Sequence, residues 1–160
     1  MIPPRRVGGN LDTRDLVAGT TLWLPVEVEG ALFSLGDTHA AQGDGEVCGT
    51  AIESPMTAVV SLDLEPGAAP AFPVFETVAA PRDVEVRDGV IATTGIGPDL
   101  MAGARDAVRA MIELLGLRYR LDPPNAYMLA SVAADLRISE IVDAPNWVVT
   151  CAVPKAIFAP

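Results

Sequence analysis

One stretch, residues 36–50 (GDTHAAQGDGEVCGT), concentrates the side chains that can do chemistry. It holds the chain's only histidine, His39, and three carboxylates, Asp37, Asp44 and Glu46. Asp37 and His39 stand two positions apart, as do Asp44 and Glu46, and residues two apart in an extended chain point to the same face. The intervening glycines let the chain fold back on itself, so the two pairs can meet.

A histidine with several carboxylates is a mixed nitrogen and oxygen donor set, suited to zinc or another divalent ion with an open position for water. Such an ion acidifies water and polarises a carbonyl, which are the two requirements of hydrolysis. The spacing is not that of an EF-hand calcium loop, because Ala41, Gln42 and Cys48 stand where ligands and a glycine are needed. An ordinary turn explains the same residues, since Asp-Gly pairs are common in turns. Spacing alone leaves the metal loop and the turn open.

The two cysteines have different expected roles. Cys48 shares a face with Glu46 if the chain is extended there, so a nucleophilic thiolate near a carboxylate or His39 is one interpretation. A neighbouring carboxylate raises a thiol pKa, however, and a cysteine in an apolar strand usually packs as a small hydrophobe. The sequence therefore favours packing for Cys48, and Cys151, set among valines, is predicted to lie in the core.

Length and composition limit the class of protein. The 160 residues suit a single domain, 1–160, and half of them are apolar, so we expect a folded chain. A net charge of -10 argues against nucleic acid and anionic membranes as partners, because like charges repel. No apolar run approaches the ~20 residues of a membrane-spanning helix. With two cysteines and no export leader, we expect reduced thiols and a cytoplasmic location.

The elements that would position the reactive stretch are mostly strands. Runs of β-branched, aromatic and apolar residues that are bounded by Gly, Pro or Asp predict strands, as does alternation of apolar and polar residues. The predicted strands are 20–28, 31–36, 46–52, 56–64, 72–78, 84–87, 90–94, 136–142 and 147–153. The reactive stretch would then follow a short buried strand directly, as a loop held by a rigid scaffold.

Two helices are predicted in the C-terminal half. Apolar residues recur at helical spacing over 100–115, with Asp99 as the N-cap and Gly116 as the stop. A second helix should begin at Asp122 and Pro123 and continue to Ala133, because aspartate caps a helix and proline suits its first turn.

Several segments resemble the acetamidase/formamidase family, which splits short linear amides into a carboxylate and ammonia. The resemblance is carried by residues 8–12 (GGNLD), 18–22 (AGTTL) and, above all, the gap-free run 30–53 (GALFSLGDTHAAQGDGEVCGTAIE). Residues 93–95, the helix after them and residues 131–142 are similar too, so the likeness covers nearly the whole chain.

The resemblance implies a mainly β fold, with a sandwich-like core and a smaller α+β portion. It also implies a metal-associated amidohydrolase site, onto which Asp37, His39 and Glu46 carry over. The resulting hypothesis has Asp37, His39 and Asp44 hold a divalent ion, zinc first and calcium second. Glu46 acts as general base with His39 beside it, and the substrate is a small amide.

Family members are longer, and the chain resembles their C-terminal half. We therefore expect it to form a homo-oligomer or to pair with an N-terminal half. The alternative hypothesis is a catalytically incomplete β-domain that serves binding or assembly. An exposed sheet edge and an apolar patch would favour that alternative.

Overall fold

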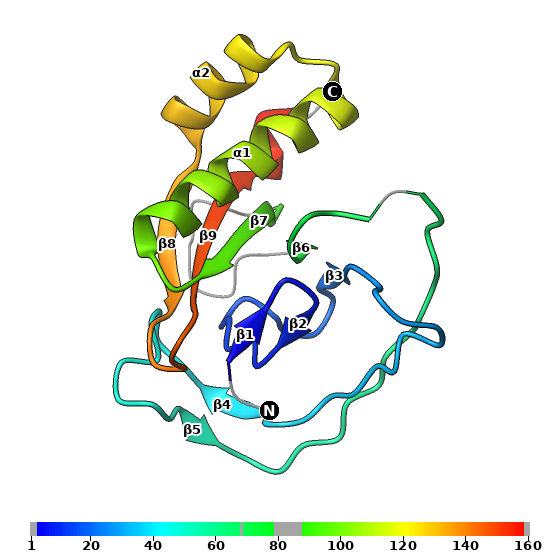
Figure 1. The fold of residues 1–160 in the computed structure, drawn as a ribbon, viewed down its shortest axis with the longest axis vertical. Helices are drawn as coiled ribbons and strands as arrows, with labels where there is room; N and C mark the ends of the chain where they lie inside the picture. The colour runs from blue at the N-terminus through cyan, green and yellow to red at the C-terminus, as the bar shows by residue number, and fades with distance from the viewer. Residues whose placement is uncertain (1–2, 68, 79–87, 159–160) are drawn as a thin grey trace.

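A five-stranded antiparallel sheet forms the centre of the molecule (Figure 1). The structure, a computed structural model, describes residues 3–67, 69–78 and 88–158. The sheet has the order β3-β6-β7-β9-β8, so its last strands in sequence lie at and beside one edge. Its strands are β3 (Thr21–Trp23), β6 (Val74–Glu76), β7 (Val90–Gly97), β8 (Asp135–Glu140) and β9 (Trp147–Pro154).

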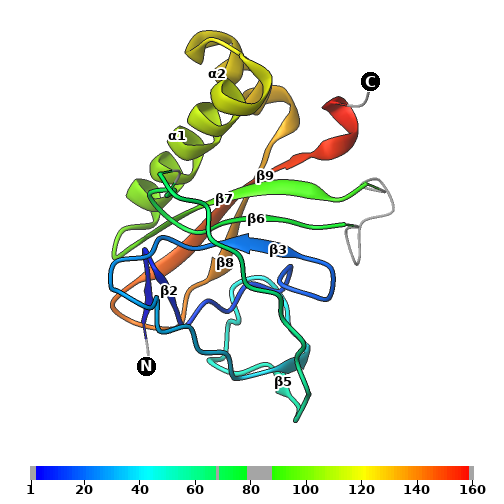
Figure 2. The same ribbon diagram turned by 90° about the vertical axis from the view of Figure 1, so that its right-hand side faces the viewer.

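Two helices cover one face of this sheet (Figure 2). They are α1 (Leu100–Tyr119) and α2 (Pro123–Ala133), and both begin at the predicted aspartate caps. Asp99 accepts a hydrogen bond from the Ala102 N–H at 2.7 Å, and Asp122 accepts one from Asn125 at 2.9 Å. A core beneath α1 joins helix and sheet; its buried members are Ala107, Met111, Leu115, Ala126, Cys151 and Val153. The predicted core position of Cys151 is confirmed.

The N-terminal segment covers the opposite face of the sheet. It carries the short pair β1 (Pro4–Arg5) and β2 (Gly8–Gly9) and then leads into β3. Phe75, Ala92 and Ala152 form a second buried cluster, against which Leu16 and Leu22 pack. The sheet is therefore covered on both faces. The prediction of a mainly β fold with two helices in the C-terminal half is confirmed.

Residues between β3 and β6 form few strands. A two-stranded pair, β4 (His39–Ala41) with β5 (Ile52–Glu53), is the regular structure there, and a 3-10 helix (Lys155–Phe158) follows β9. The strands predicted at 31–36 and 56–64 are wrong, and 46–52 contributes only Ile52 to β5. Their apolar, β-branched composition is strand-like, but no neighbouring strand pairs with them among the described residues, and Leu32 and Val59 are exposed.

Other boundaries shift by a few residues. The strands predicted at 20–28 and 72–78 shorten to β3 and β6, and the one at 84–87 lies outside the described residues. Gly116 is wrong as the helix stop: α1 continues to Tyr119, and Arg120 takes the left-handed conformation that ends it. No helix in the described ranges combines the length and apolarity needed to cross a bilayer.

Candidate functional site

His39 lies at the centre of a group of acidic side chains. Its Nε2 is 3.4 Å from Asp37 Oδ1 and 3.9 Å from Glu46 Oε1, and its side chain is 10% exposed. On the other side of the ring, Nδ1 lies 3.0 Å from the amide oxygen of Gln42. An amide oxygen only accepts, so Nδ1 carries a hydrogen, and Nε2 faces the two carboxylates. Such an arrangement calls for a cation or a proton between them.

The loop around His39 is fastened to the scaffold at two points. The Gln42 amide donates to the backbone oxygen of Asp12 at 2.5 Å. Gly45 pairs with the end of β8: its N–H donates to Ser139 O at 2.9 Å, and its carbonyl accepts from Ile141 N at 3.1 Å. These bonds carry the loop to the edge of the sheet, beside the N-terminal segment. Gly45 has φ +88°, a conformation that glycine adopts without strain, in keeping with the expectation that glycines let the chain fold back here.

Two site residues adopt a backbone conformation that side chains disfavour. Asp37 has φ 57° and Glu46 has φ 44°, both in the left-handed region. Such conformations cost of order 1–3 kcal/mol each and cluster at functional sites. Glu46 is 7% exposed, and the backbone hydrogen bonds of its neighbour Gly45 to β8 hold the chain in this conformation.

Three further carboxylates approach from other parts of the chain. Asp12, in the N-terminal segment, is 8% exposed, and its N–H donates to Glu140 Oε2 at 3.1 Å. Glu140 ends β8 and is fully buried, and Asp143 follows it in the next turn. Asn10 binds two of them: its amide donates to Asp12 Oδ2 at 2.7 Å and to Asp143 Oδ2.

Burial and mutual repulsion change the acidity of this group. Burial, together with the negative charges of Glu46 and Asp143, raises the pKa of Asp12 to about 7. Burial also raises the pKa of Glu140 to about 8, against the lowering effect of the Asp12 N–H, and raises the pKa of Glu46. Burial lowers the pKa of His39, but its bond to Gln42 and the charge of Asp37 outweigh this, so the pKa is raised on balance.

The donor atoms fit a divalent ion. One atom each from Asp12, Asp37 and His39 lie within 4.8 Å of one another, and this nitrogen and oxygen set suits zinc. Asp44, the third ligand expected from the sequence, is not among them: its carboxylate pairs with Arg14 Nε at 3.2 Å. Glu46 lies beside the group, with its Oε1 3.9 Å from His39 Nε2.

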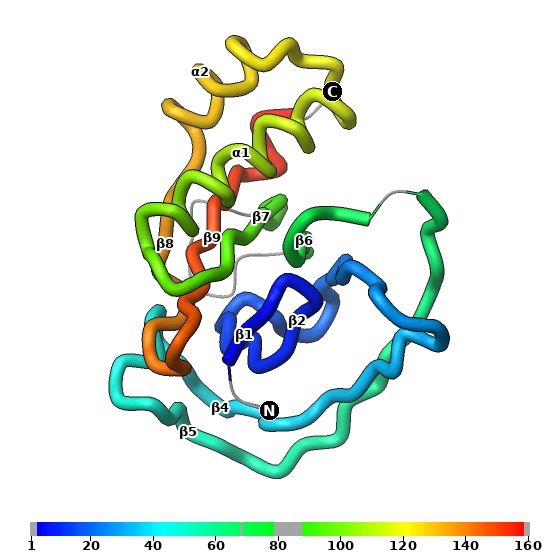
Figure 3. The backbone as a smooth tube through the Cα atoms, viewed as in Figure 1, coloured from blue at the N-terminus to red at the C-terminus, as the bar shows by residue number. Residues whose placement is uncertain are grey.

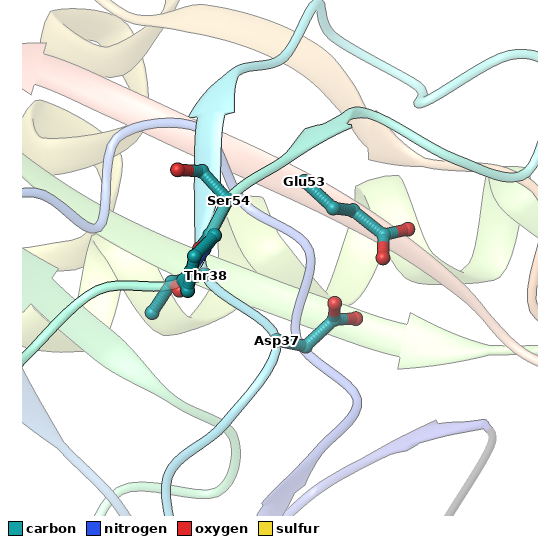
Figure 4. A pocket seen from close by; sticks show the side chains of 5 residues that line it. Asp37, Thr38, Glu53 and Ser54 are labelled. Carbon is teal, nitrogen blue, oxygen red and sulfur yellow. The ribbon is translucent and has the colours of Figure 1, made fainter.

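A surface hollow of about 350 Å³ opens next to the site. It is lined by Asp37, Thr38, Glu53, Ser54 and Pro55, and Figure 4 shows the carboxylates of Asp37 and Glu53 on the same side of it. The register of β4 and β5 brings the two segments together, because His39 pairs with Glu53 across them. Asp37 thus borders both the hollow and the buried acidic group.

Cys48 stays outside this arrangement. It is exposed, and its Sγ donates to Thr50 O at 3.4 Å. No bond found among the described residues joins it to His39 or Glu46, so the structure gives no support to a thiolate nucleophile. The buried packing expected for Cys48 is wrong as well, because the strand meant to bury it is absent.

The sequence interpretation missed Asp12, Glu140 and Asp143 as site residues. Asp12 is the last residue of the GGNLD segment that carries the family resemblance, and its place in that segment was the signal that could have identified it as a site residue. Glu140 lies in the similar segment 131–142, but the pattern of its strand gave no sign of a site residue, because strict alternation along β8 would place it on the opposite face from its buried neighbour Ser139. A register shift between Ile138 and Glu140 turns both inward.

Comparisons with known proteins identify the family of this chain. The model of the "Acetamidase/Formamidase family" matches residues 1–160. A formamidase from Methylophilus methylotrophus is 31% identical over 98% of this chain, and a putative formamidase from Schizosaccharomyces pombe is 30% identical over 94%. The chain spans 41% and 40% of those two proteins, which is consistent with the predicted C-terminal half.

Solved structures give the same result. An acetamidase from Yersinia enterocolitica superposes with a TM-score of 0.82 at 31% identity, over 99% of this chain and 44% of that one. An acetamidase from Bacillus halodurans gives a TM-score of 0.75 at 32% identity, over 98% of this chain and 49% of that one. Fold and sequence therefore point to the same family.

Proposed function

The chain belongs to the acetamidase/formamidase family, and we propose that it hydrolyses the C–N bond of short linear amides to a carboxylate and ammonia. The observation that carries the proposal is the convergence of Asp37 and Glu46 on His39 Nε2, at 3.4 and 3.9 Å. The carboxylate of Glu46, the imidazole of His39 and the carboxylate of Asp37 thereby meet beside a hollow that would receive a small amide.

In the proposed mechanism, Glu46 is the general base. Its carboxylate accepts a proton from the attacking water while the water oxygen bonds to the amide carbon. As the C–N bond breaks, Glu46 returns that proton to the departing nitrogen, and ammonia leaves. Burial suits this role, because a carboxylate removed from bulk water is a stronger base than an exposed one.

His39, Asp37 and Asp12 would hold a divalent ion, zinc before calcium, because the set contains a nitrogen donor. When bound, the ion supplies polarisation of the amide carbonyl and a lower pKa for water. Gln42 fixes the orientation of the imidazole by its contact with Nδ1. The pairing of Asp44 with Arg14 keeps the loop in place, a positioning role rather than ligation.

The test is ammonia release from formamide and acetamide by the purified chain and by His39→Ala and Glu46→Gln. A general base contributes typically 10²–10⁴-fold, so Glu46→Gln should lose about that much rate while still binding metal. Glu113→Gln, the same change at an exposed position on α1, is the matched control. Full activity in both site variants would overturn the assignment. Full activity in Cys48→Ser would exclude the thiol alternative.

A second candidate function is assembly, favoured by exposed apolar side chains between β3 and β6. Leu32, Val59, Leu62 and Leu64 are 77%, 95%, 69% and 70% exposed. Apolar side chains this numerous on adjacent segments are typical of an interaction surface. Its partner would be a second copy of the chain or an N-terminal half of the family fold.

Sedimentation velocity over a range of concentrations tests assembly. Self-association should weaken when Leu62 and Leu64 are changed to serine, and should persist in a control with Val132→Ser, which alters a residue 83% exposed on α2. An amide-inactive, metal-free chain that nevertheless associates through these leucines would favour assembly over catalysis. A monomer at every concentration would argue against homo-oligomers.

A further inference from the structure

The proposed mechanism leaves one buried group unused, the carboxylate of Glu140. Glu140 is fully buried, and its Oε2 accepts the Asp12 N–H at 3.1 Å. Its Oε1 is also buried but has no hydrogen-bond partner. Leaving a buried carboxylate oxygen without a partner is costly, so such an atom in a folded protein calls for an unseen partner.

The surroundings of Glu140 indicate what that partner is. Oxygen atoms of Glu140, Asp12 and Asp143 lie within 4.8 Å of one another. None of the ion pairs found among the described residues includes Glu140 or Asp143. Three carboxylates this close repel unless a cation or protons lie between them. The missing partner is therefore positively charged.

The cluster is also held in place in advance. Asn10 fixes Asp12 and Asp143 with one amide group, and the Asp12 backbone fixes Glu140. The register shift in β8 turns Glu140 inward, toward these two residues. In metal sites, hydrogen bonds of this kind hold the ligand side chains in their orientation.

We propose that Asp12, Glu140 and Asp143 bind a second divalent cation, and that Asp12 is shared between this position and the one at His39. The donors at the second position are all oxygen, so it should take a hard ion such as Mn²⁺, Mg²⁺ or Ca²⁺. Two-ion sites recur in hydrolytic enzymes. This inference rests on the proposed function in one respect only, because Asp12 would also bind the ion proposed at His39.

Metal titration with Mn²⁺, followed by calorimetry and electron paramagnetic resonance, tests the proposal without an activity assay. The chain should bind two Mn²⁺ ions and give the exchange-coupled spectrum of two ions that share a carboxylate. Glu140→Gln and Asp143→Asn should each bind one ion and give the spectrum of isolated Mn²⁺. Asp12→Asn should weaken both positions by at least about tenfold. Glu113→Gln is the matched control and should still bind two.

Asp143→Asn changes a less buried residue than Glu140→Gln, so one variant remains informative if the other misfolds. Circular dichroism verifies the fold of each. A single ion per chain that Glu140→Gln and Asp143→Asn both retain, or two ions in both of these variants, would overturn the second site. His39→Ala separates this from the proposed function. If the His39→Ala variant keeps both ions while Glu140→Gln loses one, the ligand set proposed at His39 is wrong and the second site stands.

Discussion

The helix-covered sheet and the outer segment, residues 24–65, are built in opposite ways (Figure 3). In the former, Met111, Leu115 and Val153 are fully buried between α1 and the sheet. In the latter, apolar side chains face outward, and Val59 is 95% exposed. Yet the outer segment carries Asp37, His39 and Glu46. The candidate site thus depends on a loosely packed segment fastened by a few polar bonds to a tightly packed scaffold.

This contrast explains where the site forms. The fastening points, Gly45 on β8 and Gln42 on the Asp12 backbone, lie at the edge of the sheet where Glu140 ends its strand. Scaffold residues supply Asp12, Glu140 and Asp143, and the outer segment supplies the histidine and the base. Binding residues placed on loops over a rigid scaffold are a common arrangement. Three pairs of substitutions and one labelling experiment would break or sharpen the comparison.

The largest effect is expected at the closest contact between α1 and the sheet. A Cβ on Gly95 would lie 1.9 Å from the backbone oxygen of Gly103, so Gly95→Ala must push the helix off β7. Overpacking of this kind costs about 3 kcal/mol or more. Gly97→Ala, in the same strand with nothing within 4 Å, is the control and should be close to neutral. Urea denaturation measures both, and equal midpoints would contradict this account of the packing.

Next in size is a matched pair of valines. Val153→Ala empties space in the core beneath α1, which should reduce the free energy of unfolding by about 2 kcal/mol. Val59→Ala, in the outer segment, should change it by less than about 0.5 kcal/mol, because that side chain is already in solvent. Thermal unfolding of the two variants gives the comparison. A large loss at Val59 would mean that the outer segment is packed in solution.

A smaller effect is expected at the fastening point. Gly45→Ala places a side chain at φ +88° and 3.2 Å from Val47 Cγ1, a cost of about 1–2 kcal/mol that falls on the loop. Gly43→Ala, with open space around it, is the control. We expect Gly45→Ala to accelerate amide hydrogen exchange around residues 39–46 while β7 and β9 keep their protection. Uniformly faster exchange would show that loop and scaffold unfold together.

The smallest perturbation uses the two thiols. Burial raises the pKa of Cys151 to about 11, so almost none of it is the reactive thiolate at pH 8. Iodoacetamide should therefore modify the exposed Cys48 first and reach Cys151 only after unfolding or at strongly alkaline pH. Mass spectrometry of peptides after timed labelling reads both rates. Comparable rates in the native chain would place Cys151 outside the core.

Local sequence determined the scaffold to a large extent. The caps Asp99 and Asp122 and the apolar spacing after them fixed where both helices begin, because those signals act within one turn. The strands β7, β8 and β9 followed from apolar runs and alternation. Residues 36–50 were identified as the reactive stretch from composition alone, because it holds the chain's histidine among carboxylates and glycines.

Tertiary structure decided the rest. The apolar runs at 31–36 and 56–64 look like strands, but a strand forms only where a neighbour completes its hydrogen bonds, and that is not a local property. The meeting of Asp12 with Glu140 spans 128 positions. It depends on a shifted register in β8 that no periodicity encodes. The residue types in the chain thus determined that a reactive stretch exists, whereas only the fold determined which distant carboxylates complete it.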